Sequence, residues 1–128
     1  ALAQANILQD IHMQEMQIGK SGNDILRSTL KRGREAGLLP TVYSHPLGFH
    51  GHAAGPTIGL WDHQEGVAGQ GDYEVYDNTA YSIELNIKIP VPEWDGQTVR
   101  IMLEEDAIMR DGDMQWLDHR QTSFHRIG

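Results

Sequence analysis

The segment SIELNIKI, residues 82–89, decides the fold class of this chain. Isoleucine or leucine fills every second position from residue 83 onward, and Glu84, Asn86 and Lys88 lie between them. An alternation with a period of two is typical of a β-strand that buries one face. Prolines at positions 90 and 92 end the strand, because proline cannot donate a hydrogen bond to a sheet.

A second strand with the same alternation follows. In residues 99–104, valine, isoleucine and leucine alternate with Arg100, Met102 and Glu104, and residues 107–109 extend the strand. Beyond it, Asp111 and Gly112 predict a hairpin turn, and a short third strand is expected over residues 114–117.

The first third of the chain has a helical pattern instead. Apolar residues at helical spacing predict an amphipathic helix over residues 1–17, with His12 expected at its surface. Ser21 is a good N-cap for a second helix, with Asp24 three residues later, and Gly37 ends that helix. Helices followed by antiparallel strands predict an α+β fold, in which two N-terminal helices pack on a curved, mainly antiparallel sheet. We expect residues 1–128 to form a single domain.

Composition argues against several classes of protein. The chain has 128 residues and a formal net charge of −8, and nucleic-acid binding needs clustered Lys and Arg instead. No apolar run approaches the roughly 20 residues of a membrane helix, so no membrane partner is expected. Because the chain has no cysteine, any metal must be held by His, Asp or Glu. The three tryptophans are expected to pack in the interior rather than to form a binding platform.

Residues 41–72 are rich in glycine, proline and histidine, which predicts loops with at most short strands. Imidazole is the commonest metal ligand and a proton carrier near neutral pH, so this stretch is a candidate site. The alternative is a solvated loop that happens to be rich in histidine. The four histidines of the stretch are His45, His50, His52 and His63, and two others, His119 and His125, lie near the C-terminus and are expected to be unrelated to a site.

Glu84 and Glu104 each lie on the polar side of a predicted strand. For one strand alone, the simplest interpretation is a carboxylate that faces water. If the two strands are neighbours, both carboxylates project from one side of the sheet, where imidazoles from the loops would meet them. Such a set of nitrogen and oxygen donors suits a hard divalent metal.

Four segments together resemble the pita-bread metallopeptidases, the family of the Xaa-Pro and methionine aminopeptidases. SHPLGFHGH at 44–52, followed by IGLWDH at 58–63, is similar to the family motif His-x-x-Gly-His-Gly-Ile-Gly-Leu-x-x-His. The order of the segments is also the order in the family, and the Xaa-Pro aminopeptidase and Xaa-Pro dipeptidase branch is the nearest because His45 is present. The other three segments are GKSGNDI at 19–25, NTAYSIE at 78–84 and VRIMLEED at 99–106.

The resemblance implies roles for individual residues. In the family, the first glutamate ligand also shuttles a proton, and Glu84 matches it. His45 and His63 match histidines that contact the substrate. The chain departs from the family at Phe49, which is inserted before the His ligand, and at residues 102–103, which are inserted before the last acid. The implied metal ligands are therefore His50, Glu84 and Glu104, with His52 and Glu105 as alternates, and strand parity favours Glu104 over Glu105.

The activity that the resemblance implies is metal-dependent hydrolysis of peptide bonds near the N-terminus of a peptide substrate. Two divalent metals, Mn, Co or Zn, would share five ligands, of which two aspartates belong to a hairpin upstream of Ala1. We therefore expect a C-terminal portion of the catalytic domain, inactive and without tightly bound metal by itself. Its expected partner is the missing N-terminal half, and a homodimer is compatible with the family.

Two alternatives remain open at this stage. One is a catalytically inactive pita-bread module that binds a peptide or a protein. The other is a cupin-like metal site, which His50-Gly51-His52 resembles, although the helical first third of the chain argues against a cupin.

Overall fold

The computed structural model describes all 128 residues and has the predicted α+β architecture. Neither helix meets the length and hydropathy that crossing a bilayer requires. The helices are α1 (Leu2–Glu15) and α2 (Gly22–Glu35), and short 3₁₀ turns occur at Gln70–Asp72 and Pro92–Trp94. The strands are β1 (Leu39–Val42), β2 (His45–Gly48), β3 (Gly51–His52), β4 (Thr79–Val91), β5 (Gln97–Arg110) and β6 (Asp113–Trp116).

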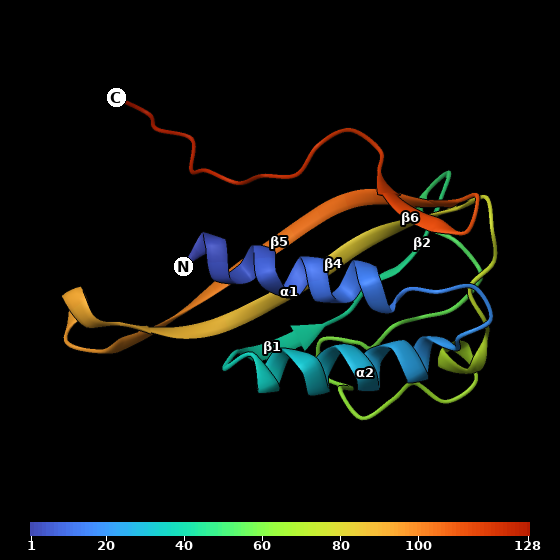
Figure 1. Cartoon of the computed structure of the whole chain (residues 1–128), viewed down its shortest axis with the longest axis horizontal. Helices are drawn as coiled ribbons and strands as arrows, with labels where there is room; N and C mark the ends of the chain where they lie inside the picture. Colours follow the sequence, from blue (N-terminus) through green and yellow to red (C-terminus); the bar gives the residue numbers. More distant parts are fainter.

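All strand pairings are antiparallel, in the order β3-β2-β4-β5-β6, and β1 also pairs with β4. The two long strands, β4 and β5, pair along their whole length and extend beyond the helices as a projecting hairpin (Figure 1). Asp111 and Gly112 have φ angles of 54° and 83°, as a tight hairpin turn between β5 and β6 requires. The predicted turn is therefore confirmed.

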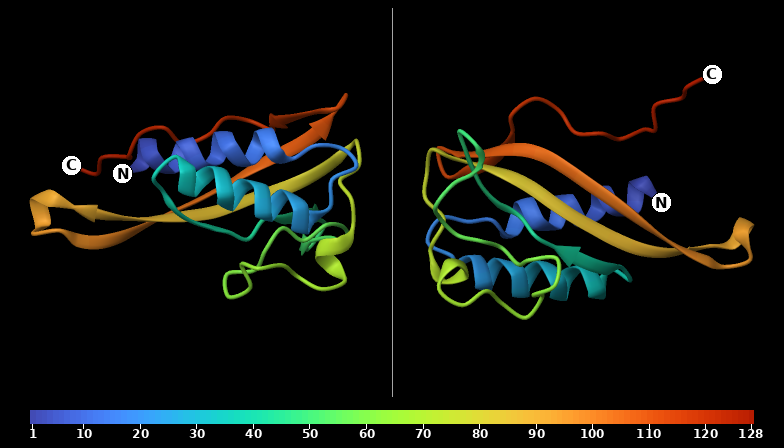
Figure 2. Two further views of the ribbon diagram at one scale, coloured as in Figure 1. Left: turned by 60° about the horizontal axis from the view of Figure 1, so that its bottom comes forward. Right: turned by 180° about the vertical axis from the view of Figure 1, so that it is seen from behind.

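Both helices lie on one side of the sheet (Figure 2). The predicted N-cap of α2 is confirmed, because Ser21 Oγ accepts a hydrogen bond of 3.1 Å from the Asp24 N–H. Glu15, at the end of α1, receives hydrogen bonds from Lys20 and from Arg32 of α2, which ties the two helices together. We call the side of the sheet that meets the helices the covered face, and the other side the open face.

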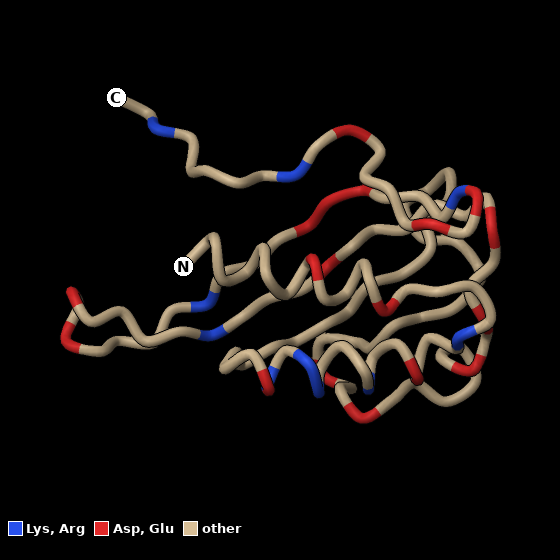
Figure 3. Tube along the Cα trace, in the orientation of Figure 1, with Lys and Arg blue, Asp and Glu red and all other residues tan.

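The alternation of β4 separates these two faces as predicted. Tyr81, Ile83, Leu85 and Ile87 are fully buried on the covered face and belong to the hydrophobic core with residues of both helices. The polar residues between them have the opposite strand parity and so belong to the open face. No helix covers that face (Figure 2). Acidic positions are spread along the trace, in keeping with the net charge of −8 (Figure 3).

The prediction that His12 lies at the surface is wrong. Its side chain is 0% exposed, and its ring lies between Thr29 of α2 and Ser44, with Nδ1 3.1 Å from Thr29 Oγ1 and Nε2 3.0 Å from Ser44 Oγ. Burial lowers the pKa of His12 to about 4, against the smaller opposite effect of the Glu15 charge, so the ring is neutral near pH 7. Helical spacing does not reveal these partners, because they are distant in the sequence.

The tryptophans also differ from the prediction that they pack in the interior. Trp116 packs against the core, but Trp61 is 77% exposed and Trp94 is 59% exposed. Trp61 follows Gly59 and Leu60 in the loop beside β1, and Trp94 lies at the end of the projecting hairpin. Their positions on loops, rather than on periodic segments, explain why neither reaches the core.

Candidate functional site

The strand register places two carboxylates side by side on the open face. Glu84 of β4 is the direct partner of Glu104 of β5, and side chains at directly opposite positions of an antiparallel pair point to the same side. Glu105, the alternate ligand, pairs with Ile83 on the covered side, where its Oε1 accepts a 2.8 Å hydrogen bond from the Gln121 N–H. The structure thus brings Glu104, and not Glu105, next to Glu84.

An imidazole from β2 contacts one of these two carboxylates, that of Glu84. His45 Nε2 lies 2.8 Å from Glu84 Oε1, and Nδ1 lies 2.9 Å from the carbonyl oxygen of Pro46. Both ring nitrogens of His45 therefore lie against oxygen atoms, which fixes the orientation of the ring. The side chains of His45 and Glu84 are 12% and 22% exposed, so this contact is partly shielded from solvent yet open to a ligand.

The structure places His52 and His50 differently. The ring of His52, on β3, stacks on that of His45 with a centroid distance of 3.7 Å. His50 lies with Phe49 in the exposed turn between β2 and β3, where its ring meets only the edge of Phe49. Gly48 and Gly51 pair on either side of this turn, so His50 lies at its tip with an exposed side chain. The alternate residue His52 is therefore the one that joins His45 and Glu84.

His63 lies in a separate tight turn. The backbone groups of Leu60 and His63 bond to each other, and the exposed His63 Nδ1–H donates to Asp62, which lowers the pKa of the Asp62 carboxyl. His63 does not line the hollow beside Glu84. The structure therefore does not bring His63 together with His45 and Glu84.

A buried network supports the site from the covered side. Ser44 Oγ accepts a 3.0 Å hydrogen bond from the Glu84 N–H and donates at 3.1 Å to the Glu84 carbonyl oxygen. The Ser44 hydroxyl proton is used in the bond to the Glu84 carbonyl oxygen. His12 Nε2–H therefore donates to Ser44 Oγ, and His12 Nδ1 accepts from the Thr29 hydroxyl. Sequence reasoning missed Ser44 and His12, because nothing in the local pattern relates a helix residue to this strand.

A hollow of about 260 Å³ lies over the site on the open face. Glu84, His45 and His52 form its polar side, and Leu60 and Trp61 add apolar wall from the loop after β3. Carboxylate, imidazole and apolar surface in one hollow suit a ligand with both polar and apolar groups, such as a peptide segment.

The donor set fits a metal in part. Glu84 uses Oε1 for His45, and Glu104 uses Oε1 to accept a 3.1 Å hydrogen bond from Ser82, so each keeps a second oxygen without a hydrogen bond. However, no three His, Asp or Glu side chains of the chain form a group that could hold a metal ion. The residues present would supply two carboxylates to a metal centre, and the remaining donors would have to come from elsewhere.

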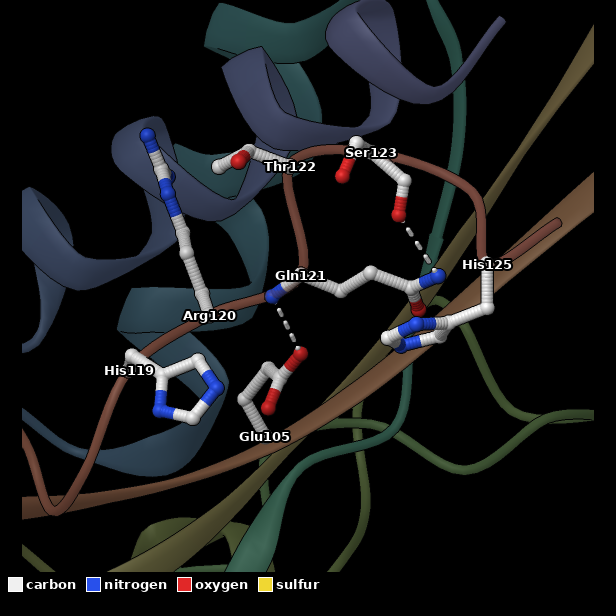
Figure 4. A pocket seen from close by; sticks show the side chains of 7 residues that line it. All are labelled: Glu105, His119, Arg120, Gln121, Thr122, Ser123 and His125. Carbon is white, nitrogen blue, oxygen red and sulfur yellow. Dashed lines mark hydrogen bonds between the residues drawn. The ribbon is translucent and has the colours of Figure 1, made fainter.

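A second hollow lies on the covered side, between β5 and the C-terminal segment (Figure 4). It is lined only by polar residues, among them His119 and His125, and Gln121 spans it by bonding to both Glu105 and Ser123. The pKa of the exposed His119 is raised by its hydrogen bond with Asp118. The two C-terminal histidines thus lie apart from Glu84, as expected.

Comparison with known proteins identifies a relative in fold. No family model matches the chain, and no curated protein matches its sequence. The crystal structure of an X-Pro aminopeptidase from Thermotoga maritima superposes with a TM-score of 0.65 and 18% identity, over 95% of this chain and 31% of that chain. At this identity the likeness concerns the fold. The chain has the fold of about a third of that aminopeptidase, which agrees with the pita-bread fold that its sequence motifs predict.

Proposed function

We propose that the protein to which this chain belongs hydrolyses peptide bonds near the N-terminus of its substrate in a metal-dependent reaction. The observation that carries the proposal is the Glu84–Glu104 pair, held on the open face with His45 against one of its carboxylates. The likeness in fold to an X-Pro aminopeptidase supports this class of reaction.

In this proposal the chain's own residues bind, orient and move a proton. His45 holds Glu84 by Oε1 and so fixes the carboxylate, which would accept a proton from the attacking water and return it to the leaving amine. Because both ring nitrogens of His45 already contact oxygen acceptors, His45 orients Glu84 rather than donating to the oxygen of a bound carbonyl group. The apolar walls at Leu60 and Trp61 would hold the substrate side chains and reduce the access of water.

Glu84 and Glu104 would hold the metal through their free oxygens, with His52 as the nearest further imidazole donor. Two divalent ions such as Mn, Co or Zn would supply Lewis acidity and lower the pKa of a bound water. We propose that the remaining ligands come from a segment packed against the open face. By itself, the chain is then expected to bind Mn weakly in calorimetric titration.

The test is hydrolysis of Xaa-Pro peptides by the full-length protein with added Mn or Co. Glu84→Gln and Glu104→Gln should each lower kcat/KM by about 100-fold or more, because each removes a charge that the reaction uses. Glu105→Gln is the matched control. It changes the neighbouring carboxylate, which faces the covered side, and should leave kcat/KM within about twofold.

Equal effects of the Glu104 and Glu105 substitutions would contradict the proposed site. If the full-length protein binds the peptides but hydrolyses none with any of these metals, the proposed reaction is wrong. The catalytically inactive binding module would then describe the protein.

A further inference from the structure

A second pair of like charges lies on the open face, four residue pairs along the strands from the glutamates. Lys88 of β4 is the direct partner of Arg100 of β5, and both have the same strand parity as Glu84 and Glu104. Like charges directly opposite each other destabilise a sheet. No ion pair of the chain includes Lys88 or Arg100, so folding leaves these two cations without counter-charges.

These cations border a hollow of about 550 Å³ that adjoins the candidate site. Trp61 and Met102 form its apolar wall, and they are 77% and 58% exposed, which is high for such large apolar side chains. Trp61 also lines the hollow over Glu84, so the two hollows share a wall. The open face thus offers one continuous path from the glutamates to the basic pair.

Asn86 lies between the two charged rows and lines the same hollow. It is only 4% exposed, its Oδ1 has no hydrogen-bond partner, and its Nδ2 is 3.5 Å from the Tyr43 hydroxyl. In either orientation of the amide, one polar end lacks a partner, and a buried polar group without a partner costs free energy. The amide of a bound peptide backbone would supply that partner.

We infer that this hollow binds a carboxylate of the peptide substrate, with Lys88 and Arg100 as its cationic contacts and Asn86 beside the peptide backbone. The inference rests on the proposed function, because it places the same substrate on the same face. Glu84 and Lys88 are four residues apart on β4, which corresponds to about 13 Å. An extended peptide spans this distance in about four residues. The preferred substrate is therefore a short peptide with a carboxylate about four residues from the bond at Glu84.

The carboxylate has two sources, a free C-terminus or an Asp or Glu side chain at the same distance. The net charge of −8 repels a carboxylate from most of the chain. On β4 and β5, by contrast, two basic positions lie side by side (Figure 3). The basic pair would therefore select substrates by their negative end.

The test measures Kd by calorimetry for three five-residue Xaa-Pro peptides, with a chelator present so that they stay intact. The first has a free C-terminal carboxylate, and the second has a C-terminal amide. The third ends in a Glu whose C-terminus is amidated, so that its only carboxylate at this end is the Glu side chain. Lys88→Gln and Arg100→Gln should each weaken binding of the free acid about threefold to fivefold, and the double variant about tenfold. The amide should bind the unmodified protein about as weakly as the free acid binds the double variant.

Arg34→Gln is the matched control, because Arg34 is an exposed cation on α2, on the covered side, and its loss should leave every Kd unchanged. Recovery of tight binding by the peptide that ends in Glu would assign the contact to any carboxylate at that distance. Weak binding of that peptide would assign it to the C-terminus.

Equal binding of acid and amide, or failure of every peptide to bind, would overturn the inference. Equal loss for acid and amide in the Lys88 and Arg100 variants would do the same. Hydrolysis that does not distinguish acid from amide would remove the basic subsite and leave the proposed reaction intact. Binding that prefers the free acid, without hydrolysis under any metal, would remove the proposed reaction and leave the basic subsite intact.

Discussion

The two long strands, β4 and β5, present a covered face to the helices and an open face on the other side, and these faces contribute differently to the protein. On the covered face, Ile83, Leu85 and Ile87 are fully buried and make the core. On the open face, the residues between them carry charge or polar groups, and the glutamate and lysine–arginine pairs each set like charges opposite each other. The covered face stabilises the fold, and the open face keeps pairs of like charges, which destabilise a sheet.

The difference teaches where to look for function. Local arrangements that oppose folding are expected where a protein uses them for a ligand. On the covered face apolar side chains fill the core, whereas on the open face two such pairs of like charges lie on either side of the row that holds Asn86. Three predictions test this contrast, from the largest expected effect to the smallest.

The first compares two neighbours on opposite faces. Ile83→Ala should lower the free energy of unfolding by about 3 kcal/mol, because it leaves a cavity in the core. Glu84→Gln, one residue along, should change it by less than about 1 kcal/mol, since the amide oxygen still accepts from His45. Urea denaturation of both variants measures the contrast. Similar losses would mean that the open face also holds the fold together.

The second concerns the polar network inside the covered face. Burial lowers the pKa of His12 from 6.5 to about 4, so the unfolded chain binds a proton in this range that the folded chain does not. The stability that this group contributes is complete above pH 6.5 and is lost as the pH falls towards 4. The loss amounts to about 3 kcal/mol, at 1.4 kcal/mol per pH unit.

Ring chemical shifts of the folded protein measure this directly. His12 should stay neutral down to about pH 4, whereas the exposed His119, whose pKa is raised by Asp118, should titrate above 6.5. His119→Gln should leave the loss of stability between pH 6.5 and 4 unchanged. A His12 ring that titrates with His119 would show that the network around Ser44 is open to water.

The third concerns a single atom of the covered face. The Tyr81 hydroxyl is buried without a hydrogen-bond partner, and burial raises the pKa of Tyr81 to about 12. Tyr81→Phe should therefore leave the free energy of unfolding unchanged or raise it by up to about 1 kcal/mol. Thermal and urea unfolding measure the change. A loss above about 1 kcal/mol would show that the hydroxyl has a bonded partner.

Local patterns predicted much of this architecture. The alternation around Glu84 and Glu104 was sufficient to place both carboxylates on one face, because side-chain direction in a strand repeats every two residues. Ser21 with Asp24 marked the start of α2, and Asp111 with Gly112 marked the last hairpin turn, since both signals arise within a few residues.

The histidines were harder to place. The family motif favoured His50, but the structure sets His52 against His45 and leaves His50 in the turn. Strands β2 and β3 have four and two residues, too few for a periodic signal, and their pairing decides which imidazole faces the sheet. Gly59 belongs to the family motif and has a φ angle of 74°. A Cβ at this position would collide with the Val42 carbonyl oxygen, so the glycine allows the loop to pack closely on β1.

By itself, the sequence determined the helices, the long strands and the face on which each strand residue lies, because spacing and caps are interactions among near neighbours. Only the tertiary structure decided that His45 reaches Glu84, that His12 is buried against Ser44, and that Lys88 stands opposite Arg100. These contacts join residues that are far apart along the chain. They depend on how strands pair and how loops close over the sheet, which no local pattern records.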